Sequence, residues 1–151
     1  MAKEKKGGTL QLSCFYVGKA LCGMDISQVQ EINKELLFTD VPQSPDYVLG
    51  IMNLRGRIVT IIDMGKKLGL GRTKMTAYSR VIIVQSKGEF VGLLVDRIAD
   101  VNTVQEEDIS PPPSNIKGVR GTYFQGVVRI KTGLVAIVDV EKVLELKAER
   151  G

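Results

Sequence analysis

The sequence predicts an all-β fold with only short helices, arranged as small barrels or a sandwich. Two observations lead to this prediction. Short apolar segments rich in β-branched residues recur along the chain, and turns containing Gly or Pro separate them about every eight to twelve residues. In addition, one strand-turn-strand segment occurs twice. Such spacing favours barrels or a sandwich over a parallel sheet with crossover helices.

The repeated segment, residues 50–63, matches residues 126–139 without a gap. Each copy predicts a strand, a turn containing glycine, a second strand and an Asp that N-caps a short helix. We therefore expect a single domain, residues 10–148, made of two similar halves at about residues 10–72 and 79–148. Whether the halves exchange strands is left open. Each half is too small to be stable alone, so the two should share apolar surface.

The elements of the first half follow from local pattern and turn chemistry. Residues 27–32 fit helix and strand equally, and residues 46–49 are expected to form one helical turn. Asp63 should cap a helix over residues 64–68 that stops at Gly69. Strands are expected at residues 10–17, 20–26, 36–41 and 58–62.

The second half is predicted to begin after a mobile basic linker, residues 69–74. Residues 106–115 are acidic and proline-rich, so they should form a loop that cannot continue a sheet. Apolar residues at helical spacing predict a closing helix over residues 140–148. Strands are expected at residues 80–85, 89–95 and 101–104.

The composition indicates where in the cell the protein is expected to work. The chain has 21 Lys and Arg against 17 Asp and Glu, which gives a net charge of +4. Residues 1–9 are expected to be a disordered leader. They lack the apolar centre of a signal peptide. No stretch approaches the ~20 apolar residues of a membrane span. We therefore expect a cytoplasmic protein without direct membrane insertion.

Several classes of chemistry are not expected. Histidine is absent, which excludes Ser-His and Cys-His nucleophiles and His-ligated metals. No dinucleotide or phosphate-binding fingerprint is present. We expect no catalytic residue, metal or cofactor. Cys14 and Cys22 should be small buried thiols, although a disulfide is conceivable if they lie on paired strands.

Nucleic-acid binding is the alternative function that the fold class leaves open. The basic residues between 66 and 74 could contact phosphates. Nucleic-acid modules normally interleave aromatic residues with the charge, and none lies between Tyr47 and Tyr78. The favoured interpretation is an adaptor that binds no nucleic acid and keeps apolar strips on its barrel edges.

Specific segments indicate a family. Residues 25–32, 50–56 and 91–96, together with Asp63, closely resemble the CheW family of chemotaxis coupling proteins. The most specific signal is Asn-Leu-Arg-Gly before a strand that ends in Asp, and the resemblance extends over most of the chain. One departure is Thr60, where family members often carry proline. We expect it to change the local backbone without loss of function.

The resemblance implies a fold and a function. The fold would be two SH3-like five-stranded β-barrel subdomains packed on a shared core, with a short C-terminal helix. The function would be that of a non-enzymatic adaptor. It would join the regulatory domain of the histidine kinase CheA to the cytoplasmic tips of methyl-accepting chemoreceptors in membrane-associated arrays. Rings with other coupling proteins are also implied.

The resemblance also implies binding residues. Apolar members of the receptor groove would accept a receptor helix, its glycines would allow close approach, and Arg55 and Glu31 would pair to orient the partner. Ordinary core positions are the alternative for the apolar members. The receptor groove would comprise Val29, Glu31, Ile32, Gly50, Asn53, Arg55, Gly92 and Val101. The kinase contact should use strand edges at the barrel ends, near Val81, Ile82, Ile83 and Val84.

Overall fold

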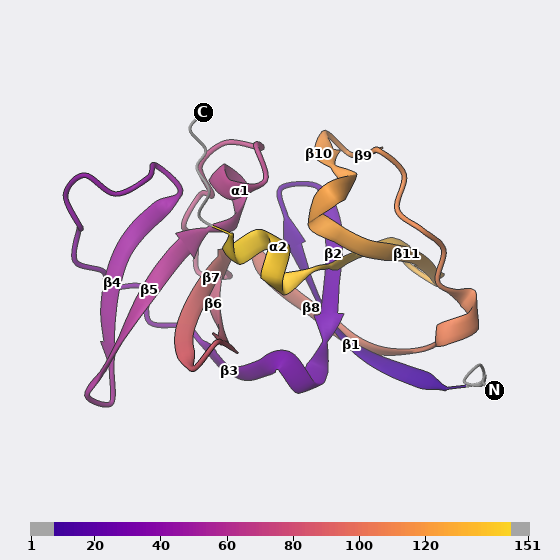
Figure 1. The fold of residues 1–151 in the computed structure, drawn as a ribbon, viewed down its shortest axis with the longest axis horizontal. Coiled ribbons are helices and arrows are strands. Elements are labelled where there is room, and N and C mark those ends of the chain that lie inside the picture. Colours follow the sequence, from indigo (N-terminus) through magenta and orange to yellow (C-terminus); the bar gives the residue numbers. More distant parts are fainter. Residues whose placement is uncertain (1–7, 146–151) are drawn as a thin grey trace.

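The structure is a computed structural model that describes residues 8–145. Two five-stranded sheets lie side by side, with the helix α2 between them (Figure 1). The helices are α1 (Met64–Lys67) and α2 (Val140–Leu144). The strands are β1 (Thr9–Val17), β2 (Ala20–Asp25), β3 (Val29–Asn33), β4 (Val48–Leu54), β5 (Arg57–Asp63), β6 (Arg80–Ser86), β7 (Glu89–Val95), β8 (Arg97–Gln105), β9 (Asn115–Ile116), β10 (Val119–Arg120), β11 (Phe124–Ile130) and β12 (Gly133–Val138).

One sheet combines strands from near both ends of the chain, and the other takes the five consecutive strands β3 to β7. One has the order β11-β12-β2-β1-β8 and the other the order β3-β6-β7-β5-β4. The pairs β12–β2 and β5–β7 are parallel, and the other neighbours in the two sheets are antiparallel. The outer strands β11 and β8 of the first sheet also contact each other, as expected of a sheet that curls toward a barrel.

Apolar side chains form a shared core between the sheets and a separate core inside each. Phe15 and Met24 of one sheet meet Ile82 and Leu93 of the other in the shared core. Along β6, Val81 and Ile83 point into the interior of their own sheet, whereas Ile82 and Val84 point into the shared core. A strand covered on both faces explains its continuous apolar run. The predicted mainly-β fold, with two five-stranded units on a shared core and a short helix near its C-terminal end, is confirmed.

The two copies of the repeated segment have the same local structure. In the first, Ile51 and Thr39 exchange two backbone hydrogen bonds of 2.8 Å. In the second, Val127 and Ser110 exchange bonds of 2.8 and 2.9 Å. A Cβ atom at Gly50 would lie 2.3 Å from the carbonyl oxygen of Thr39. The glycine is therefore needed because the preceding loop crosses the strand directly over it.

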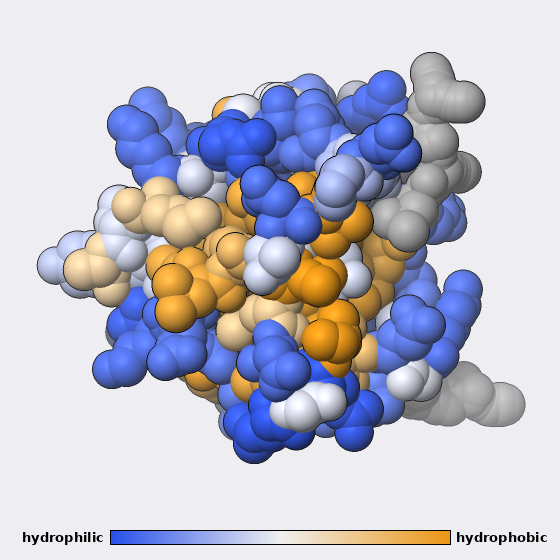
Figure 2. Space-filling model, turned by 90° about the vertical axis from the view of Figure 1, so that its left-hand side faces the viewer, coloured by the Kyte–Doolittle hydropathy of each residue, from blue (hydrophilic) through white to orange (hydrophobic). Residues whose placement is uncertain are grey.

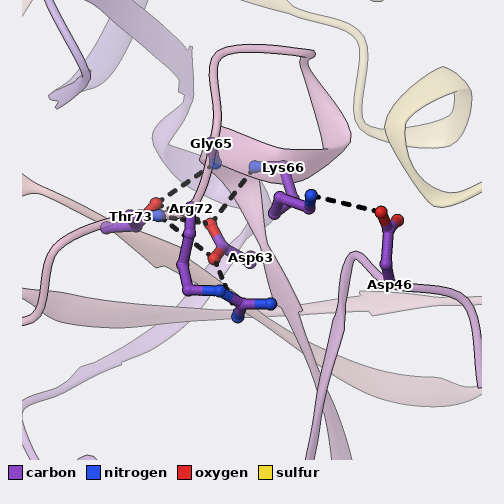
Figure 3. Close-up of polar contacts among 6 residues, drawn as sticks. All are labelled: Asp46, Asp63, Gly65, Lys66, Arg72 and Thr73. Carbon is purple, nitrogen blue, oxygen red and sulfur yellow. Dashed lines mark hydrogen bonds and ion pairs between the residues drawn. The ribbon is translucent and has the colours of Figure 1, made fainter.

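Asp63 connects the helix α1 to the segment that follows it (Figure 3). Its buried carboxylate accepts hydrogen bonds from the backbone N–H of Lys66, at 3.3 Å, and from the hydroxyl of Thr73, at 2.6 Å. The backbone N–H of Thr73 also donates to it, and Arg72 lies 3.8 Å away. Asp63 is the predicted helix cap. The prediction of a mobile linker is not supported, because buried Thr73 is fixed by these bonds.

Two predictions between β3 and β4 are wrong. Residues 36–41 do not form a strand, because the segment crosses β4 and pairs with it only at Thr39. Residues 46–49 are not helical: a turn closed by the Val48 N–H on the Pro45 carbonyl, at 3.0 Å, leads directly into β4. The ambiguous residues 27–32 divide into a 3-10 turn, Ile26–Gln28, and the strand β3.

Other boundaries also shift. The predicted strand at residues 101–104 is the end of the longer β8. The closing helix ends at Leu144, since Glu145 is extended, and the rest of its predicted range lies outside the described residues. Most of the predicted leader is outside them too, while Thr9 belongs to β1. Cys14 and Cys22 are buried free thiols, and burial raises the pKa of Cys22 to about 12.

Candidate partner-binding surface

The turn between β4 and β5 is built from Asn53, Arg55 and Gly56. Both central residues have positive φ, +53° at Arg55 and +83° at Gly56, as a two-residue hairpin turn requires. The side-chain oxygen of Asn53 accepts a hydrogen bond of 2.8 Å from the Gly56 N–H. Lys87 before Gly88 has the same backbone geometry, so the turn itself does not distinguish Arg55. Its side-chain contact does.

Arg55 pairs with Glu31, as the sequence led us to expect. Its guanidinium donates to both oxygens of the Glu31 carboxylate, with one contact at 3.5 Å, and it remains largely exposed. The amide of Asn33 donates to the same carboxylate at 3.4 Å. Hydrogen bonds from Arg55 lower the pKa of Glu31, and the bond to Glu31 raises the pKa of Arg55. Two parallel bonds fix the orientation of the guanidinium.

The pair also connects two strands that are distant from each other in the sheet. Glu31 lies on β3 and Arg55 directly follows β4, and these strands are the two outer strands of the same sheet. The contact therefore joins the two edges of the sheet through side chains, although no backbone hydrogen bonds pair these two strands. A partner that binds across this junction would meet a charged group in a fixed place.

Two of the three apolar residues of the predicted receptor groove are exposed and are not ordinary core. Ile32 on β3 is 42% exposed, and Val101 on β8 is 50% exposed. Val29, also on β3, is half-buried and packs against the shared core. Ile32 and Val101 lie on strands of different sheets, so the predicted groove would span the junction between the sheets.

The predicted glycines have roles inside the chain. Gly50 is buried against Thr39, as described above. At Gly92, on β7, an added Cβ would lie 2.6 Å from side-chain atoms of both Ile61 and Val81. Asn53 is exposed and stabilises the hairpin turn. These three residues therefore shape β4, its turn and β7, and none of them presents a free apolar surface.

The prediction that the kinase contact uses the strand edge near residues 81–84 is wrong. β6 lies between β3 and β7, so it offers no free edge. Its side chains fill the two cores on either face. The fully buried residues are Val81, Ile82, Ile83 and Val84. Because they are buried in an inner strand, they cannot contact a partner unless the sheet opens. The prediction failed because an apolar run is typical of a strand buried on both faces as well as of an exposed edge.

An apolar surface lies over β4 and β5, and the sequence predicted apolar strips on the barrel edges without assigning this one to a partner. Figure 2 shows apolar side chains gathered at the centre of this face, with polar side chains around them. Ile58 of β5 is 58% exposed, and Leu37 and Val41, in the loop before β4, are exposed as well. The sequence signal for this exposure was the position of Ile58, which lies at the start of its strand next to the turn, where neighbouring strands bury a side chain least.

Two further features of the described residues bear on function. Within residues 8–145, no cluster of Cys, Asp and Glu side chains could hold a metal ion. None of the helices in this range is long and apolar enough to cross a membrane.

Comparison with known proteins gives one consistent result. The family model for the CheW-like domain matches residues 11–148. The chemotaxis protein CheW of Rhizobium meliloti (strain 1021) is 34% identical, over 94% of this chain and 92% of that protein. The CheW of Treponema pallidum (strain Nichols) is 35% identical, over 91% and 83%. The crystal structure of the scaffolding protein TtCheW from Thermoanaerobacter tengcongensis is similar with a TM-score of 0.85 and 28% identity, over 99% and 96%.

Proposed function

The chain belongs to the CheW family of non-enzymatic chemotaxis scaffold proteins, and from this premise we propose that it couples chemoreceptors to the histidine kinase CheA. In this proposal it works in the cytoplasm at membrane-associated receptor arrays. The observation that supports the proposal most directly is the pair formed by exposed Arg55, on a hydrogen-bonded turn, and Glu31 on β3.

The receptor contact is proposed at the surface around that pair. A receptor helix would place apolar side chains against Ile32, Val101 and the exposed part of Val29, in a helix-in-groove mode. Arg55 would meet a polar group of the helix and set its orientation. Gly50, Asn53 and Gly92 would act by shaping β4, the turn and β7.

The contact with the regulatory domain of CheA is proposed at the apolar face over β4 and β5. Large apolar groups that stay exposed together, with polar residues around them, often mark a binding surface. Ile58 on β5 and Leu37 in the loop before β4 are both exposed, and β4 is an outer strand of its sheet. Other coupling proteins could use the same face in rings.

Co-sedimentation tests this proposal. Receptor cytoplasmic fragments assembled on vesicles are mixed with CheA, with or without this protein, and the pelleted CheA is measured. We expect the protein to raise the pelleted CheA several-fold. Val101→Glu should weaken attachment to receptor vesicles, and Ile58→Glu should weaken recruitment of CheA while attachment persists.

Leu134→Glu is the matched control, because Leu134 is an exposed apolar residue on the other sheet, at the β11–β12 hairpin. It should behave as the unmodified protein in both measurements. Equal loss in all three variants would show a general effect of added negative charge. Absence of the protein from the receptor pellet, with or without CheA, would contradict the proposed function.

A further inference from the structure

A second polar surface lies away from the proposed contacts, where the β1–β2 turn, the β7–β8 turn and the segment before β6 meet. Two adjoining hollows of about 470 and 500 Å³ occur there. They share Tyr78 and Arg97 as a common wall. The other lining residues are Tyr16, Gly18, Lys19, Thr76, Arg80, Asp96 and Ile98.

Tyr78 is held out into solvent by a loop with its own hydrogen bonds. The Tyr78 N–H donates to the hydroxyl of Thr76, at 3.0 Å, and the Thr76 N–H donates to the hydroxyl of fully buried Ser79, at 2.9 Å. The guanidinium of Arg80 donates to the carbonyls of Ala77 and Ser79, at 3.0 and 2.7 Å. Tyr78 is nevertheless 70% exposed. A large aromatic side chain on an ordered loop is available for contact at little entropic cost.

Arg97 is held in place from the opposite side. Its guanidinium lies over the ring of Tyr16, 4.1 Å from the ring centre. The turn that carries it is fixed by two bonds: the Asp96 N–H donates to the Tyr16 carbonyl at 2.9 Å, and the Gly18 N–H donates to the Asp96 carboxylate at 2.7 Å. Arg97 is therefore a stacked, oriented cation.

Charge at this surface is not balanced within the molecule. Lys19, Arg80 and Arg97 line the hollows together with a single carboxylate, that of Asp96. Among residues 8–145, none of the three cations forms an ion pair with a carboxylate. Unpaired cations beside exposed aromatic rings can bind an anionic ligand that also offers apolar or aromatic groups.

We propose that these hollows bind an acidic segment of a partner protein through Arg97, Lys19 and Tyr78. A peptide fits the mixed lining better than a nucleic acid does. Asp96 and the hydroxyl of Thr76 can accept hydrogen bonds from peptide N–H groups, which a phosphate backbone does not offer. The three cations are confined to two adjoining hollows, whereas a phosphate chain binds along an extended basic groove. Ile98 offers an apolar contact for a side chain of the segment.

The test uses the whole protein and a short fluorescein-labelled peptide of alternating glutamate and alanine with a central phenylalanine. Binding is followed by fluorescence anisotropy, and backbone amide shifts in NMR spectra locate it. We expect shifts concentrated in residues 76–80 and 96–98. Arg97→Glu and Lys19→Glu should each lower the affinity at least about tenfold, and Tyr78→Ala several-fold. The matched control Arg129→Glu, at an exposed position on β11, should change it less than about twofold.

Circular dichroism of each variant checks that the fold is retained. A lysine version of the peptide should not bind, and added salt should weaken binding of the glutamate version. Equal effects of Arg97→Glu and Arg129→Glu would overturn the proposal, since binding would then reflect net charge alone. Tighter binding of single-stranded oligothymidylate, or displacement of the peptide by inorganic phosphate alone, would also overturn it. So would the absence of any binding of the peptide.

Discussion

The guanidinium of Arg55 bonds to both carboxylate oxygens of Glu31, and the two residues lie at opposite edges of one five-stranded sheet. Backbone pairing alone does not join these edges. The contact is exposed, and exposed ion pairs contribute little to stability. Its value is therefore expected to lie in recognition, because two parallel hydrogen bonds hold the arginine in one orientation at the rim of the proposed receptor surface.

Replacing Arg55 should separate recognition from stability. In Arg55→Glu the pair is replaced by two like charges, yet both groups remain hydrated. We expect a melting temperature within about 3 °C of the unmodified protein and a severe loss of receptor-dependent kinase stimulation. The double variant Arg55→Glu with Glu31→Arg restores the pair in reverse and controls for charge. A large drop in melting temperature would show that Arg55 is structural.

The Glu31 carboxyl should titrate below its ordinary pKa of 4.5, because hydrogen bonds from Arg55 favour its charged form. A lowered pKa in the folded state means that the pair stabilises the fold above the unfolded-state pKa. That contribution is lost as the pH falls through the folded-state pKa. Side-chain NMR measures the midpoint directly. In Arg55→Gln it should rise toward 4.5, and an unchanged midpoint would argue against the pairing.

Gly50 should tolerate alanine less well than Gly133 does. Both glycines have a positive φ, +152° and +143°, but only at Gly50 would the new Cβ meet another segment, the backbone of Thr39. Backbone strain should cost about 1–3 kcal/mol at either site. The clash should cost Gly50→Ala a further 1–3 kcal/mol, roughly, in the free energy of unfolding. Urea denaturation measures both, and equal losses would contradict the close crossing of the loop.

Asp63 and Asp139 cap equivalent helices but should contribute differently to the stability of the fold. Asp139 accepts one hydrogen bond, from the Lys142 N–H at 3.3 Å, so Asp139→Ala should cost about 1 kcal/mol. Asp63 is buried and also binds Thr73, so Asp63→Ala leaves buried donors unpaired and should cost about 2–4 kcal/mol. Thermal or urea unfolding of the pair of variants measures this difference. Similar losses would mean that the bonds to Thr73 contribute little.

Local sequence was sufficient for most strands and both helix caps. β-branched runs, turn residues and the duplicated segment are short-range signals, and they correctly predicted the hairpin at Arg55-Gly56. The strand expected at residues 36–41 failed for a long-range reason. That segment crosses β4 above Gly50, and no local pattern shows which strand a loop will cross.

The candidate site was predictable to a similar extent. The pairing of Arg55 with Glu31 followed from the family resemblance and is present in the structure. Burial was harder to predict. Val81 to Val84 and Ile58 belong to similar apolar runs, but the first group lies between two neighbouring strands while Ile58 lies beside the hairpin turn and stays exposed. Strand order decides this, and it depends on pairing between distant segments.

The most direct test of the coupling role is the rate of CheA autophosphorylation in a reconstitution with receptor cytoplasmic fragments. The rate is measured with each component omitted in turn. If the protein couples the two, strong stimulation occurs only when receptor fragments, CheA and this protein are all present, and Arg55→Glu largely removes it. The same rate with and without the protein, under conditions in which receptor fragments and CheA are both active, would contradict the proposed coupling function.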